Sequence, residues 1–166
     1  MTTLPAPAPA PPPRLLCDEM LAALARWLRA SGHDTALAPP GASDGRLLAQ
    51  CRSEDRVLIT RDQALARSAP PVRVVLLASD DLDQQAAALT GALGLDWDLA
   101  PFTRCMTDNT PLNPATPEEI ARMPETSRRL PGPFRACPCC GRLYWPGSHV
   151  RRMAERLRAW AKTEQG

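Results

Sequence analysis

The sequence predicts an α/β fold in which a parallel-sheet domain is followed by a small loop-rich module and a C-terminal helix. Between residues 14 and 100, apolar runs alternate four times with segments of helical periodicity, and this alternation is typical of a parallel sheet. The chain then becomes rich in proline, threonine and cysteine and loses sustained periodicity. We therefore divide it into a disordered Pro/Ala-rich tail over 1–13, an α/β domain over 14–100, and the module with its terminal helix over 101–166.

The folded part opens with a short strand over residues 15–17. Asp18 follows as the expected N-cap of a helix, because its carboxylate can accept hydrogen bonds from the free N–H groups of a first turn. Gly32 is placed to end that helix, and a second strand is expected over 33–39. The helix is indicated by apolar residues at helical spacing, namely Met20, Leu21, Leu24, Trp27 and Leu28.

Each later unit repeats the order of strand and helix. Ser43 and Asp44 are the expected cap of one short helix, and Asp62 opens another directly after the strand RVLIT. The run VRVVLLAS is the kind of apolar strand that is buried on both faces of a parallel sheet. The expected strands are 56–60 and 72–79, and the expected helices are 44–51, 63–68, 80–94 and 148–166.

Five aspartates stand where the chain leaves a strand or starts the following helix. Because the carboxyl ends of parallel strands share one edge of a sheet, we expect these side chains to meet at one rim. Clustered carboxylates suit Mg²⁺ or Mn²⁺, and the associated chemistry is metal-assisted hydrolysis of a phosphodiester. The alternative is that each aspartate is only a helix cap. The candidates are Asp18, Asp44, Asp62, Asp80 and Asp81.

Four residues of the loop-rich module form a candidate Zn²⁺ site. Cys137 and Cys140 have the two-residue gap that lets both thiolates face one ion. Cys105 lies upstream, and three positions beyond it is Asp108, where a matching pair would have a second cysteine. Aspartate also binds zinc, so these four residues are the predicted ligands.

Two alternatives stay open for the module. His149 or Cys139 would replace Asp108 if its carboxylate does not reach the site. In the other alternative the second pair has decayed, and the segment is held by packing of aromatic side chains, namely Trp97, Phe102, Tyr144 and Trp145.

Composition limits the classes of function. The formal net charge of +2 gives no whole-molecule field that would select a polyanion. No stretch approaches the ~18 apolar residues of a membrane helix, and the N-terminus lacks the apolar core and basic start of a secretory signal. We therefore expect no membrane association and a cytoplasmic location, where cysteines are reduced and clustered ones serve as metal ligands.

Five stretches carry a resemblance to a known family. They are LLCDEMLAALARWLRASGHDT, VLITRDQALA, LLASDDLDQQ, PFTRCMTDNTPL and CPCCGRLYWPGSHVRRM. Together they resemble the Mut-seven C-terminal RNase family, which pairs a PIN-like nuclease domain with a zinc ribbon. The resemblance covers residues 14 to 157 in unbroken order.

The resemblance implies a PIN-like fold and Mg²⁺- or Mn²⁺-dependent cleavage of RNA by clustered acids. Asp18 matches the acid after the first strand, Asp44 that of the following short helix, and Asp62 that of the T-R-D turn. Asp80 or Asp81 would be a further member. In the ribbon, the family pattern has four cysteine ligands, and this chain departs from it at Asp108.

RNA is the partner that the resemblance implies. A second copy of the chain and an inhibitory protein are further candidate partners, because many PIN-like proteins dimerise and some are held by an antitoxin. The competing hypothesis is a non-catalytic ribbon that binds RNA or protein beside a vestigial acidic site. Arg61 is expected either to contact phosphate or to pair with a carboxylate.

The terminal helix is basic and amphipathic, with Met153, Leu157 and Trp160 as its buried stripe. Its arginines are interpreted either as a solvated face or as contacts to RNA phosphates.

Overall fold

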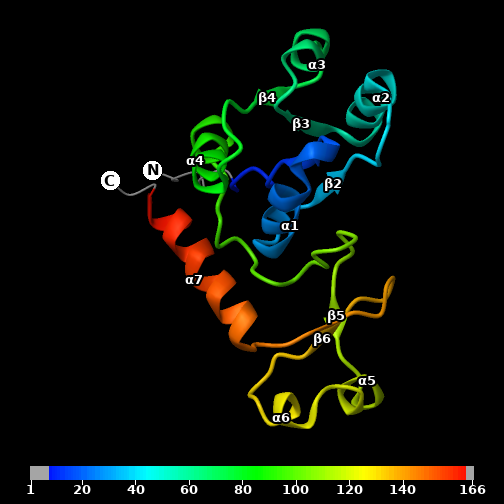
Figure 1. Cartoon of the computed structure of the whole chain (residues 1–166), viewed down its shortest axis with the longest axis vertical. Helices are drawn as coiled ribbons and strands as arrows, with labels where there is room; N and C mark the ends of the chain where they lie inside the picture. The colour runs from blue at the N-terminus through cyan, green and yellow to red at the C-terminus, as the bar shows by residue number, and fades with distance from the viewer. Residues whose placement is uncertain (1–7, 164–166) are drawn as a thin grey trace, which may run out of the picture.

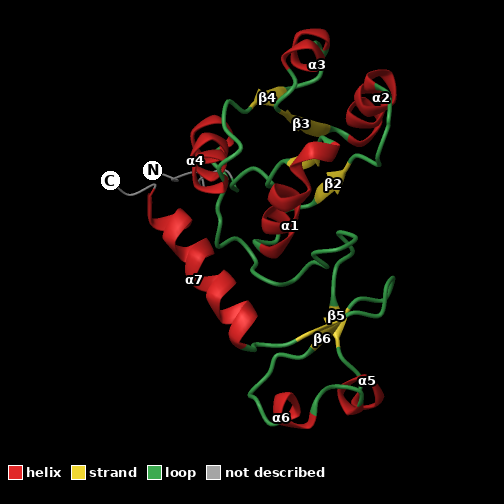
Figure 2. Cartoon of the chain, in the orientation of Figure 1, coloured by secondary structure: helices red, strands yellow, loops and turns green. Residues whose placement is uncertain are grey.

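A computed structural model describes residues 8–163, so residues 1–7 of the predicted disordered tail lie outside the described part of the chain. Parallel strands form the main sheet in the order β2-β1-β3-β4 (Figure 1). This parallel pairing, with helices between the strands, confirms the predicted α/β class. The strands are β1 (Arg14–Cys17), β2 (Thr35–Leu37), β3 (Arg56–Thr60) and β4 (Val74–Leu76) (Figure 2).

Helices cover both faces of the main sheet. One face packs against α1, α4 and α7, and the other packs against α2 and α3. A single 3-10 turn, η1, leads into α1. The bounds are η1 (Glu19–Leu21), α1 (Ala22–Ala30), α2 (Asp44–Glu54), α3 (Gln63–Ser68), α4 (Leu82–Leu93) and α7 (Ser148–Lys162).

Side chains of the central strands alternate between two apolar cores, because successive residues of a strand point to opposite faces. Leu15 and Cys17 belong to the core under α1 and α7, whereas Leu16 belongs to the core under α2 and α3. All three side chains are fully buried. Burial of a leucine stabilises a fold by about 1.5–3 kcal/mol, so this short strand is anchored from both sides.

The first helix begins and ends where the sequence predicts. Asp18 caps η1, and its carboxylate accepts a hydrogen bond of 2.7 Å from the N–H of Glu19. The chain leaves α1 through Gly32, which has a φ of +100°. A Cβ at this position would lie 2.6 Å from the carbonyl oxygen of Ala100, so a larger residue does not fit.

The edge strand β4 is shorter than the predicted strand over 72–79. As an edge strand it has one neighbour, β3, and it pairs with that strand over three residues. Val72 and Leu77 flank it and are still buried, whereas Leu76 within it is 46 % exposed. The apolar run therefore reports burial at both ends of the strand and not the length of its pairing.

The C-terminal helix α7 packs on the α/β domain, and its predicted apolar stripe is confirmed. Met153, Leu157 and Trp160 are buried in the core that α1 shares. The Trp160 ring meets the rings of Trp27 and Trp97 edge-on, with centroids 5.1 and 4.8 Å away. Neither α7 nor another helix within residues 8–163 is both long and apolar enough to cross a membrane.

The loop-rich module contains a small antiparallel sheet in the order β5-β6-β7. Each of its strands has only two residues, so backbone pairing alone holds little of this segment together. Two short helices lie between β5 and β6. The bounds are β5 (Asn113–Pro114), α5 (Pro117–Ala121), α6 (Glu125–Arg128), β6 (Arg135–Ala136) and β7 (Leu143–Tyr144).

We predict that the buried imidazole of His33 makes stability depend on pH. Burial lowers its pKa below the ordinary value of 6.5. Below that pH the unfolded chain binds a proton that the folded chain does not, so the free energy of unfolding falls as the pH falls. The slope approaches about 1.4 kcal/mol per pH unit.

Denaturant unfolding between pH 7 and pH 5.5 measures this slope. His33→Gln should flatten it, because glutamine binds no proton in this range. Its amide N–H can still donate to the carbonyl of Asp96, which lies 2.9 Å from the imidazole Nε2 of the native chain. His149→Gln is the matched control, because the chain has only two histidines and the second is exposed. An unchanged slope in His33→Gln would contradict the assignment.

Candidate functional site

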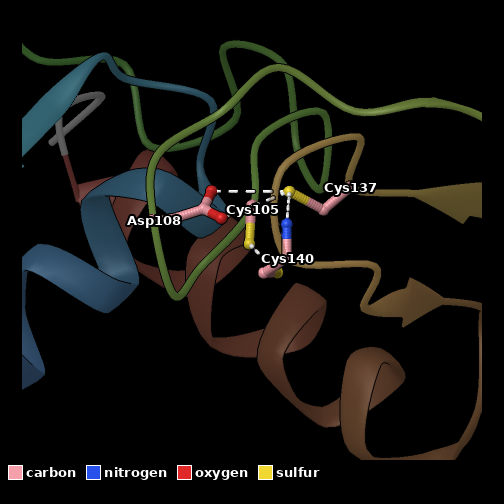
Figure 3. Close-up of side chains that lie close together, drawn as sticks. All are labelled: Cys105, Asp108, Cys137 and Cys140. Carbon is pink, nitrogen blue, oxygen red and sulfur yellow. Dashed lines mark hydrogen bonds between the residues drawn. The ribbon is translucent and has the colours of Figure 1, made fainter.

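Four residues of the loop-rich module bring their metal-binding atoms together (Figure 3). Cys105, Asp108, Cys137 and Cys140 each offer one ligand atom, and these atoms all lie within 4.8 Å of one another. The Sγ atoms of Cys105 and Cys140 are 3.7 Å apart, and a carboxylate oxygen of Asp108 lies 3.3 Å from the Sγ of Cys137. The group that the spacing predicted is therefore present, and it could hold a metal ion.

The two halves of this group repeat one backbone turn. In each half the residue after the second ligand adopts a left-handed conformation, Asn109 at φ 70° and Gly141 at φ 74°. Its N–H donates to the carbonyl of the first ligand residue, and the first ligand residue donates to the residue beyond. These bonds are Asn109 to Cys105 (2.9 Å), Cys105 to Thr110 (2.8 Å), Gly141 to Cys137 (3.0 Å) and Cys137 to Arg142 (2.9 Å).

Asp108 thus stands at the position in the first turn that Cys140 occupies in the second. The two substitutes that the sequence left open lie outside the group among the described residues. The ligand atoms that define the group do not include the sulfur of Cys139, and the ring of His149 lies 3.3 Å from the guanidinium of Arg26. The carboxylate of Asp108 is therefore the fourth ligand candidate.

Asp108 and Cys105 are both biased toward their charged forms. Partial burial alone would raise the pKa of the Asp108 carboxyl, but hydrogen bonds from Thr110 and the Cys137 thiol lower it below its usual range. Burial also opposes ionisation of Cys105, yet the hydroxyl of Tyr144, 3.2 Å from its sulfur, lowers the pKa of this thiol. Deprotonated thiols and carboxylates are the forms that bind metals.

The group does not hold four negative charges by itself. At Cys140 the N–H of Arg142 favours the thiolate, but burial and the nearby sulfurs of Cys137 and Cys105 raise the pKa of the thiol to about 12. One thiol therefore keeps its proton when no cation is near. A bound cation would relieve the repulsion and displace this proton, which couples metal binding to pH.

A buried arginine fixes the turn that carries Cys105 and Asp108, which we call the first metal-binding turn, to the α/β domain. Arg29, in the last turn of α1, donates from Nε to the carbonyl of Thr35 at 2.8 Å. Its Nη1 donates to the carbonyls of Met106 and Thr107 at 3.2 and 2.9 Å. The guanidinium thus links the start of β2 to the residues between Cys105 and Asp108.

Asp34 makes a second link at the same place. It accepts hydrogen bonds from Asn109 (2.8 Å), Arg56 (2.8 Å) and Arg14 (3.0 Å). Partial burial would raise the pKa of its carboxyl, but these donors outweigh burial and lower it. Asn109 in turn accepts from the N–H of Thr35 at 2.9 Å. Neither link to this turn could be predicted from a local pattern, because the bonded residues lie 74 to 78 positions apart along the chain.

A threonine connects the residues that follow β1 and β3. The hydroxyl of Thr60, the last residue of β3, donates to Asp18 at 2.9 Å, and it accepts from the N–H of Asp62 at 2.9 Å. The N–H of Asp18 also donates to the carbonyl of Ile59. The Thr60 hydroxyl therefore links the carboxylate of Asp18 to the backbone of Asp62, and both residues stand at the carboxyl ends of adjacent strands.

Three of the five candidate aspartates also cap helices. Asp62 accepts from the N–H groups of Ala64 and Leu65 at 2.7 and 3.1 Å, and Asp81 accepts from Gln84 at 2.9 Å. Asp18 caps η1, as described above. These bonds leave lone pairs free on each carboxylate, so capping and metal binding are compatible.

The other two aspartates are exposed, and neither caps its helix. At α2 the cap is Ser43, whose hydroxyl accepts from the N–H of Arg46, and Asp44 is the first residue of the helix. Asp80 precedes the capping residue of α4. Within residues 8–163, no three of the five aspartates form a group as close as that in the loop-rich module.

The aspartates and the cysteine group lie at opposite ends of the strands of the main sheet. Asp18 and Asp62 follow the ends of β1 and β3. Arg14 and Arg56 are the first residues of the same strands, and both bind Asp34 beside the metal-binding turn. The two candidate sites are thus separated by the length of the strands.

Comparison with known proteins gives one family. The family model of the Mut7-C RNAse domain matches residues 13–157. No curated protein and no solved structure matches the chain.

We predict that Co²⁺ binds with three thiolate ligands. Thiolate-to-cobalt absorption of the native chain should reach about three quarters of that of Asp108→Cys, and in Cys140→Ser it should fall to about two thirds of the native value. A spectrophotometric Co²⁺ titration measures both ratios. Cys139→Ser is the matched control and should leave the spectrum unchanged; equal losses in Cys139→Ser and Cys140→Ser would contradict the ligand set.

Proposed function

Because the chain belongs to the Mut7-C RNAse domain family, we propose that it is a metal-dependent ribonuclease that hydrolyses RNA phosphodiester bonds at the aspartates of the sheet edge. The observation that supports this location is the Thr60 hydroxyl, which donates to the Asp18 carboxylate and accepts from the backbone N–H of Asp62. The strand order reverses between β1 and β3, and open α/β sheets bind their ligands at such a point. This arrangement also favours a PIN-like form of the fold.

The donor chemistry of the rim fits Mg²⁺ or Mn²⁺, which prefer carboxylate oxygens. We assign the central pair of ligands to Asp18 and Asp62, with Asp44 approaching from the side of β2 and Asp80 or Asp81 from the side of β4. When bound, such an ion would activate a water molecule and stabilise the charge of the phosphate that is cleaved.

The protein's own residues would orient the ligands and the substrate. The Thr60 hydroxyl holds one oxygen of Asp18, and the cap bonds of Asp62 fix the other carboxylate, so both enter the site in one orientation. Arg61 lies between Thr60 and Asp62 in the sequence. It is exposed and forms no ion pair among the described residues. This favours a phosphate contact for Arg61 over pairing with a carboxylate.

We infer that the cysteine group holds a structural Zn²⁺. Three thiolates and a carboxylate suit tetrahedral zinc, and strands of two residues need such a cross-link. The group lies at the sheet edge away from the aspartates, so its role is to fold the module and fix it to the domain. The six free cysteines suit a reducing compartment, and we propose the cytoplasm.

We predict that Asp62→Asn lowers RNA cleavage by at least about 100-fold. The amide keeps the shape and the cap, because asparagine is as good an N-cap as aspartate, but it removes the charge that a cation needs. Cleavage of labelled single-stranded RNA in Mn²⁺ measures the loss.

Asp98→Asn is the matched control, because this aspartate is exposed and lies outside the rim, and its carboxylate forms no hydrogen bond or ion pair among the described residues. It should cleave as the native chain does. Equal cleavage by Asp62→Asn and the native chain, or no cleavage by well-folded native protein, would refute the proposal and favour a non-catalytic binding module.

A further inference from the structure

Two adjoining cavities are lined by residues of α1, of the small sheet and of the start of α7. Their volumes are about 460 and 340 Å³. They share part of their lining, including Arg26 of α1 and both Tyr144 and Trp145 at the end of β7. We call the two cavities together the junction groove.

The junction groove is positively charged. Arg26, Arg122 and Arg142 line it from three separate segments, and all three are exposed. None of them forms an ion pair with another described residue. No aspartate or glutamate lines either cavity. Three uncompensated guanidinium groups around one groove favour a ligand that carries several negative charges.

Aromatic rings form the rest of the wall. Trp145 is partly exposed, and its ring packs over Gly147, where a Cβ would lie 3.1 Å from the indole Nε1. The Tyr144 hydroxyl is held by the N–H of Met106 at 3.1 Å and by the sulfur of Cys105, so its ring is fixed to the metal-binding turn. The Tyr144 ring is therefore held in place before a ligand binds, and Gly147 leaves room for the indole beside it.

We propose that the junction groove binds single-stranded RNA, with phosphates on the arginines and unstacked bases on Trp145 and Tyr144. Charged grooves lined with aromatic rings bind single strands in this way, whereas the bases of a duplex are stacked on one another and cannot reach the rings. An acidic peptide would use the arginines but would gain nothing from base stacking. The choice of RNA as the nucleic acid rests on the proposed ribonuclease function.

The position of the groove suits a strand that continues to the aspartates. Arg26 stands eight residues after Asp18 along η1 and α1, since 26 − 18 = 8. At rises of about 2.0 Å per residue in the 3-10 turn and about 1.5 Å in α1, the two lie on the order of 12–15 Å apart along the axis. An RNA strand held at the groove would therefore reach the rim along α1.

The test is fluorescence anisotropy of a labelled ten-nucleotide single-stranded RNA without added Mg²⁺ or Mn²⁺, so that cleavage does not interfere. Arg26→Glu and Arg142→Glu should each weaken binding at least tenfold, and each should reduce the slope of log affinity against log salt by about 0.7. Arg67→Glu is the matched control, because it makes the same charge change at an exposed position on α3 and should weaken binding less than twofold.

The aromatic wall has its own test. Trp145→Ala should weaken binding at least fivefold without changing the salt slope, and Trp145→Phe should restore most of the loss because a phenyl ring still stacks. Circular dichroism of each variant checks that folding is kept. Equal losses in Arg67→Glu and Arg26→Glu, equal binding of a duplex, or native affinity in Trp145→Ala would overturn the proposal.

The groove and the nuclease proposal fail separately. Native RNA affinity in all groove variants, together with loss of cleavage in Asp62→Asn, would overturn the groove alone. If the native chain binds RNA but does not cut it, and the groove variants lose that binding, the groove is supported and the nuclease proposal is refuted.

Discussion

The arrangement of the α/β domain and the loop-rich module depends on the hydrogen bonds of the buried Arg29 guanidinium. Burying a charge is costly unless it is hydrogen-bonded, and here the Nε and Nη1 atoms donate to three carbonyl oxygens, one from β2 and two from the turn between Cys105 and Asp108. The geometry of the guanidinium therefore fixes the distance and orientation between the main sheet and the loop-rich module. Asp34 adds a second connection beside it, with Asn109 on one side and two arginines on the other.

Because of this connection, the two ends of the parallel strands carry different sites. The module and its cysteine group lie where the strands begin, and the aspartates lie where the strands end. A metal in the module would thus stabilise the fold without entering the proposed reaction. The junction groove lies along α1, which spans the distance between these ends, so it is placed to present a bound strand to the aspartates.

Local features could be predicted from the sequence because they depend on residues close together in the chain. Examples are the strand over 56–60 and the caps at Asp18 and Asp62. The convergence of Cys137 and Cys140 is another, because it follows from the two residues between them. The pairing of Asp108 with the cysteines followed from matching the spacing of two turns.

Other features depend on contacts between distant segments and left no local pattern. Arg29 in a helix looks like an ordinary solvated charge, and only the fold shows that it is buried against a turn more than 70 residues later. The length of β4 could not be predicted because it is set by the border of the sheet. How closely the five aspartates approach one another also depends on loop conformations, and Asp18 and Asp62 are the pair that the structure joins through a hydrogen-bonded residue.

The central claim is that a divalent cation binds between Asp18 and Asp62, and anomalous diffraction from crystals soaked in Mn²⁺ tests it most directly. We expect a manganese peak at the carboxyl ends of β1 and β3, within bonding distance of both carboxylates. No peak at this edge, or manganese only at the cysteine group, would contradict the assignment of the aspartates as the catalytic site.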